Sequence, residues 1–115
     1  MKSFYKVLFI STIGVLLLMI IISWNRAYNP LIKNTATLNF PSTNSLESSD
    51  LTMSVSGAAD GNVVSIGIPN GSVNAGCSYF AWVSSANTVS VRFYNGTISP
   101  VDPASGTFSV IVVKF

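Results

Sequence analysis

The side chains that most often carry out chemistry are scarce and scattered in this chain. It contains no histidine, one cysteine and four acidic residues, Glu47, Asp50, Asp60 and Asp102. General acid–base catalysis needs a histidine or carboxylates paired in a cleft, and Asp50, Asp60 and Asp102 are scattered over expected loops. Metal ligation needs a histidine or cysteine cluster or closely spaced carboxylates, and neither pattern occurs. We therefore expect no catalytic residues, no cofactor, no metal site and no small-molecule substrate.

A binding surface is the alternative, and two aromatic residues are its candidates. Tyr79 and Trp82 could form a platform on which a sugar ring stacks, or they could lie in the core or at a subunit interface. Arg92 is the one basic residue of its expected strand. An ion pair, for example with Asp102, explains it more simply than a ligand contact does. Cys77 is expected to be a small hydrophobic residue, with a disulfide between subunits as the alternative.

Two tripeptides, Asn70-Gly71-Ser72 and Asn95-Gly96-Thr97, match the pattern for N-glycosylation. Asn-Gly is also the strongest short signal for a tight turn between two strands. We therefore expect both tripeptides to be turns.

An uncharged, apolar run occupies residues 7–24, after the basic N-terminus 1–6. As a helix it would be about 27 Å long, close to the ~30 Å hydrocarbon core of a bilayer. It predicts a transmembrane helix followed by a juxtamembrane spacer at 25–36. A cleaved signal peptide is the alternative, although the run is long for one and lacks a cleavage pattern of small residues. The main anchor residues are Val7, Leu8, Phe9, Ile10, Leu16, Leu17, Leu18, Ile20, Ile21, Ile22 and Trp24.

From residue 37 to residue 115 the pattern changes to apolar and polar residues in alternation, which is typical of half-buried strands. Strands are expected near 38–40, 51–55, 64–68, 79–84, 88–94 and 107–115. They predict an all-β domain of about six strands, a small antiparallel β-sandwich or jelly-roll-like fold. The last strand is apolar on both faces and runs to Phe115, so we expect it to be centrally paired or covered. A homo-oligomer, preferably a trimer, would bury its second face.

Three segments of this region resemble a small β-domain found in bacteriophage virion and tail proteins. They read GAADGNVV at 57–64, AWVSSANTVSVRFYN at 81–95 and DPASGTF at 102–108. The likeness extends over about residues 38–115 and implies an oligomeric structural or host-contacting virion component without catalysis. The matching positions are Gly57, Gly61, Val83, Asn87, Val89, Arg92, Asn95, Asp102 and Pro103.

The predicted membrane helix distinguishes this chain from the family it resembles, in which the β-domain usually ends a longer soluble chain. Helix and domain together suggest a minor structural protein of a phage with a lipid membrane inside an icosahedral capsid. The expected partners are that membrane, or the host cell membrane during assembly, and capsid or vertex proteins. With a net charge of only +2, nucleic acid is not an expected partner. The alternatives are a bacterial envelope adhesin, a pilus-like subunit, or a secreted carbohydrate-binding module.

Overall fold

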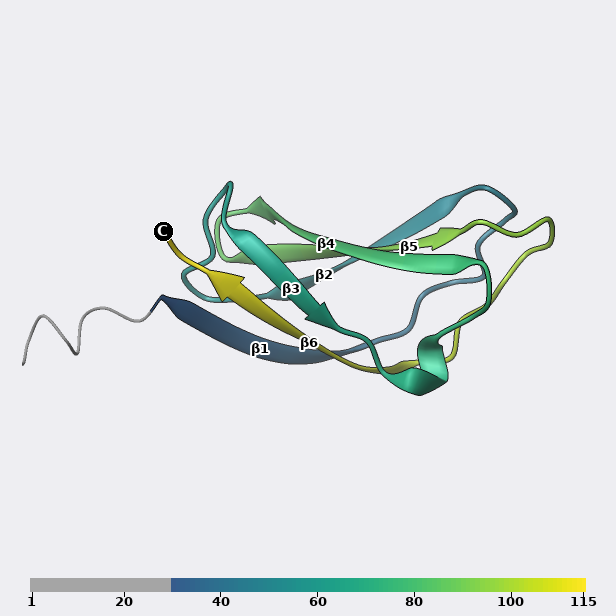
Figure 1. Ribbon diagram of the computed structural model, residues 1–115, viewed down its shortest axis with the longest axis horizontal. Helices are drawn as coiled ribbons and strands as arrows, with labels where there is room; N and C mark the ends of the chain where they lie inside the picture. Colours follow the sequence, from purple (N-terminus) through teal and green to yellow (C-terminus); the bar gives the residue numbers. More distant parts are fainter. Residues whose placement is uncertain (1–29) are drawn as a thin grey trace, which may run out of the picture.

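The computed structural model describes residues 30–115, which form six β-strands and one short 3₁₀-helix (Figure 1). The predicted anchor at 7–24 lies outside the described residues. Within residues 30–115, no helix is long and apolar enough to cross a membrane. The elements are β1 Leu31–Leu38, β2 Ser48–Ser54, β3 Val63–Gly67, η1 Asn70–Ser72, β4 Cys77–Ser85, β5 Thr88–Asn95 and β6 Gly106–Val113.

The strands form two antiparallel sheets of three, which face each other across the core (Figure 1). One sheet has the order β1-β6-β3 and the other the order β2-β5-β4. This confirms the predicted all-β fold of six strands. Of the two architectures predicted, the arrangement matches a small sandwich, because a jelly roll requires eight strands.

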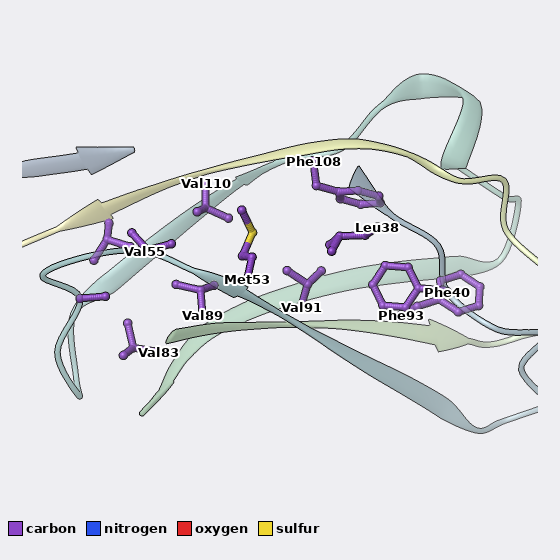
Figure 2. Close-up of a cluster of buried hydrophobic side chains, with 12 residues drawn as sticks. Leu38, Phe40, Met53, Val55, Val83, Val89, Val91, Phe93, Phe108 and Val110 are labelled. Atoms are coloured by element: carbon purple, nitrogen blue, oxygen red, sulfur yellow. The ribbon is translucent and has the colours of Figure 1, made fainter. Parts of the chain in front are cut away.

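The core comes mainly from the central strands β5 and β6, in which every second side chain points inward (Figure 2). These six side chains are at most 1% exposed: Val89, Val91, Phe93, Phe108, Val110 and Val112. Phe40 packs between the sheets, with its ring centroid 5.8 Å from that of Phe108. Fully burying each such side chain contributes about 1.5–3 kcal/mol to folding.

The final strand is centrally paired, as its two apolar faces predicted. β6 lies between β1 and β3, so both of its edges are hydrogen-bonded. β1 begins at Leu31 and pairs with β6 residue for residue as far as Leu38, which faces Gly106. Residues 31–36, predicted to be part of the spacer, therefore belong to the sheet. Without β1, the apolar strand β6 would have one unpaired edge, since β3 pairs only with its other edge.

The sandwich has two ends, which we call proximal and distal. The proximal end contains residues 30–31, the loop 55–62, the β4–β5 turn at 86–87 and residues 113–115 (left in Figure 1). The distal end contains the loops 39–47, 68–76 and 96–105 (right in Figure 1). Because the described chain starts at the proximal end, this end is the closer of the two in sequence to the predicted anchor.

Candidate functional site

The clearest candidate site is a shallow depression on the outer face of the β2-β5-β4 sheet. Strand alternation turns Phe80 and Trp82 of β4 outward, together with Arg92 and Tyr94 of β5. With Ser48 of β2 these residues line a volume of about 610 Å³. We call this set of five residues the aromatic face. Phe80 is 54% and Trp82 is 37% exposed, an unusual amount of aromatic surface to leave in water.

Arg92 is held in place on two sides within the aromatic face. Its Nε donates to Asp50 Oδ1 at 2.7 Å and its Nη2 to Asp50 Oδ2 at 2.8 Å. The two residues are directly opposite each other in the β2–β5 register. The guanidinium carbon also lies 5.0 Å from the ring centroid of Trp82, which is cation–π geometry. The charged fork and the indole therefore form one preorganised unit.

The Arg92–Asp50 pair keeps both groups ionised. The hydrogen bond from Arg92 holds the pKa of the Asp50 carboxyl below its ordinary value of 3.8. The same hydrogen bond raises the pKa of Arg92. Both side chains are more than 40% exposed, so the pair contributes little to stability. Its main effect is to place a fixed donor and a fixed acceptor beside exposed aromatic rings.

The aromatic face has the features of a binding surface. Exposed rings offer apolar area with little conformational entropy to lose, and the Arg92–Asp50 pair adds polar specificity. Within residues 30–115, no three or more His, Cys, Asp or Glu side chains lie close enough to hold a metal ion. The arrangement can take up a flat apolar or amphipathic surface, such as a peptide segment or a sugar ring.

Tyr79 and Trp82 do not form a platform, because the two side chains point to opposite faces of β4, and Tyr79 takes the alternative position expected for it, against the core. The Tyr79 ring lies in the core, 5.2 Å from those of Phe93 and Phe108. Its hydroxyl donates to the Ser72 carbonyl at 2.6 Å. Burial raises the pKa of Tyr79 above 10.0, with a smaller contribution from nearby Cys77. An odd separation in a strand predicts opposite faces, so sequence parity alone pointed to Phe80 as the partner of Trp82.

Motif residues from two of the three sequence segments meet at the proximal end. Asn87 lies in the β4–β5 turn with φ of +61°, which asparagine tolerates better than most residues. Its side-chain oxygen accepts a hydrogen bond from the Gly57 nitrogen at 2.7 Å. Gly57 and Gly61 have φ of +92° and +82°, values that favour glycine. Between the two ends, the motif residues Val83 and Val89 lie in the core.

At the distal end, Asn95 is fully buried and organises the loops around it. Its side-chain nitrogen donates to the carbonyls of Thr43 at 2.9 Å and Ser99 at 2.8 Å. Its side-chain oxygen accepts from the Thr97 nitrogen at 2.9 Å and the Thr97 hydroxyl at 2.6 Å. Cys77 is half-buried, with its Sγ 3.7 Å from the same oxygen. Asn95 is thus a structural residue, and its buried amide is closed to glycan attachment in the folded domain.

Several other sequence expectations are corrected by the positions of the residues. Arg92 pairs with Asp50 and not with Asp102, which is exposed in the distal 96–105 loop, and Pro103 beside it is buried. Neither Asn-Gly pair forms a tight turn between strands, because Asn70 starts η1 and Gly96 begins a long loop. The tight turn is instead at Ala86-Asn87, which connects β4 to β5. Just before this turn, the pairing of β4 with β5 shifts register between Val83 and Ser85.

No known protein family, curated protein or solved structure matches this chain. The resemblance to phage virion domains therefore stays a prediction that rests on the three sequence segments. What the structure itself defines is a small antiparallel sandwich with an exposed aromatic surface on one sheet.

Proposed function

We propose that this chain is a membrane-anchored minor structural protein of a phage virion. Its N-terminal run would lie in the internal membrane, or in the host membrane during assembly, and its β-domain would bind a protein of the capsid shell, vertex or spike. The observation that carries the proposal is the aromatic face, because a tether needs an exposed surface with which to bind a second component. The uncharged run at 7–24 and the three virion-like segments support the membrane and the particle as the two components.

The aromatic face has the composition of a protein-binding surface. Aromatic residues and arginine are enriched at the energetically dominant positions of interfaces, especially where they are rigidly held. Trp82 and Arg92 fix each other, and Asp50 fixes the arginine from the opposite side. Little side-chain freedom is then lost when a partner covers them. We expect Trp82→Ala to weaken partner binding by at least about 2 kcal/mol, the size typical of such central anchors.

Glycan binding is a second candidate, favoured by the same rings. Sugar rings stack their C–H faces on aromatic side chains, while the hydroxyls bond to charged groups such as the Arg92–Asp50 pair. This candidate is the predicted carbohydrate-binding module with a different residue set, in which Phe80 and Tyr94 replace Tyr79.

Site-specific photocrosslinking in purified particles separates the two candidates. A photoreactive residue replacing Phe80 should crosslink to one shell, vertex or spike protein, whereas one replacing Thr35, exposed on the other sheet, should not. Release of the chain from particles should require detergent. Recovery of the chain in the soluble fraction without detergent would contradict the anchor. No crosslink, combined with glycan binding that Trp82→Ala abolishes, would establish the second candidate instead.

A further inference from the structure

The outer face of the β1-β6-β3 sheet changes polarity along its strands. In the register of this sheet, Val113 lies between Leu31 and Val63, and these three residues form the row nearest the proximal end. Leu31 is 44% and Val63 51% exposed. Ile111 lies in the next outward row at 38%, and Phe115 follows at 91%. We call these five residues the proximal apolar patch.

The rest of the same outer face is polar. Beyond Ile111 the outward rows contain Thr35, Ser109 and Gly67, and then Thr37 and Thr107. Apolar surface is therefore confined to the end at which the described chain begins. A symmetric contact through the whole sheet would bury these hydroxyl-bearing rows as well, and a contact limited to the proximal end would not. The distribution favours a partner that reaches only this end.

The predicted anchor would bring a lipid surface close to that end. Only residues 25–29 separate Trp24, the last residue of the predicted anchor, from Pro30. Fully extended, the chain from Trp24 to Pro30 spans at most about 20 Å. The proximal end is thus held near the bilayer at a high effective concentration, so that even a weak contact is occupied.

We infer that the proximal apolar patch rests on the bilayer surface, an inference that depends on the proposed membrane anchor. Aliphatic and aromatic side chains partition into the boundary between headgroups and acyl chains, and the strength of the contact scales with apolar area. Lys33, opposite Ile111 in the register, and Lys114 can reach lipid phosphates, while Asp60 in the proximal loop offsets part of this charge. The contact therefore depends on apolar burial and forms on zwitterionic lipid.

Fluorescence quenching in proteoliposomes tests this inference with the full chain. The native Cys77 is replaced by alanine, and one cysteine is introduced at Ser65, an exposed residue opposite Ile111. After labelling with a small fluorophore, the chain is reconstituted in phosphatidylcholine vesicles that carry a spin label near the headgroup. The reference label is at Ile98, which is 95% exposed at the distal end, about 25 Å away along the strands.

We expect the Ser65 label to be quenched several-fold more strongly than the Ile98 label. Val63→Asp should reduce quenching at Ser65 to the reference level, whereas Thr37→Asp, on the same face but in a polar row, should leave it unchanged. Equal quenching at both labels in vesicle-bound protein, or no effect of Val63→Asp, would overturn the contact and leave the anchor standing. If the chain does not float with the vesicles at all, the anchor fails, and the contact fails with it.

Discussion

Replacement of Asn95 by alanine tests whether one buried amide holds the distal loops together. The Asn95 side chain is 0% exposed and links three points of the chain. Its nitrogen donates to Thr43 and Ser99 carbonyls, and its oxygen accepts two hydrogen bonds from Thr97. The alanine variant removes these four bonds and the weak one from Cys77 Sγ at 3.7 Å, and it leaves a small polar-walled gap.

The expected loss follows from what each partner retains. The Thr43 carbonyl still accepts from the Val101 nitrogen at 3.0 Å. The Thr97 hydroxyl, freed from Asn95 and 2.9 Å from the Ser99 carbonyl, can turn its one proton to that carbonyl. Those two losses therefore fall near 0.5–1 kcal/mol each, whereas the Thr97 nitrogen loses its acceptor and costs about 1–2 kcal/mol. We expect Asn95→Ala to lower the free energy of unfolding by about 3 kcal/mol. For a domain of this size the loss corresponds to about 15 °C in Tm.

Thermal unfolding followed by near-ultraviolet circular dichroism measures this change. The matched control is Asn70→Ala, in the same Asn-Gly-hydroxyl context but exposed, and it should alter stability by less than about 0.5 kcal/mol. Asn95→Asp keeps the shape but turns an oxygen toward two carbonyls, so at pH 7 it should be at least as destabilising as alanine. A Tm shift below about 3 °C for Asn95→Ala would refute the assignment, since it would correspond to less than one hydrogen bond.

Three further predictions concern other parts of the sandwich. Gly57→Ala should cost at least about 1 kcal/mol in urea denaturation because φ is +92°, whereas Gly71→Ala, with open space around it, should be close to neutral. Tyr79→Phe should cost about 1 kcal/mol through loss of its hydroxyl hydrogen bond, and ultraviolet pH titration should show one tyrosine of raised pKa disappearing. Because the folded pKa of Asp50 is lowered, its contribution exists above about pH 4 and is lost as pH falls through the folded value. Asp50→Asn should therefore reduce the fall of Tm in acid slightly, and an unchanged pH profile would contradict the pairing with Arg92.

The predictable part of the fold is the part whose side chains alternate strongly. β6 buries every second residue, and β5 does so except at Ser90, which is buried as well. The apolar stripe Val89, Val91 and Phe93 is visible in the sequence and forms part of the core. Residues 31–36 of β1 are not recognisable as a strand from the sequence, because an edge strand joins the sheet mainly through its backbone. Its side chains include Lys33 and Asn34, which leave a weak pattern.

The candidate site depended on information that is not local. Arg92 and Asp50 are 42 residues apart, and only the β2–β5 register places them opposite each other. The sequence alone therefore does not distinguish Asp50 from Asp102 as the partner of Arg92. By residue type Phe80 could equally well be a core residue, and it is exposed only because it lies on the outer face of β4. The run of apolar residues on both faces of β4 hides this difference until the sheet order is known.

The exposed apolar residues of the two sheets lie on opposite outer faces of the sandwich and are distributed differently along the strands. On the β1-β6-β3 sheet, the proximal apolar patch gives way to threonine and serine toward the distal end. On the β2-β5-β4 sheet a polar row comes first. Its proximal row is Ser54, Thr88 and Ser85, and the aromatic face begins only beyond it. Two separate areas of this kind cannot both be covered by one flat partner, because the sheets themselves stand about 10 Å apart. A two-fold dimer formed through one area would leave the other in water. A protein that connects two different components, one at the end nearest its predicted anchor and one on the far sheet, leaves neither exposed, and this arrangement is the one that the proposed tether between membrane and shell requires.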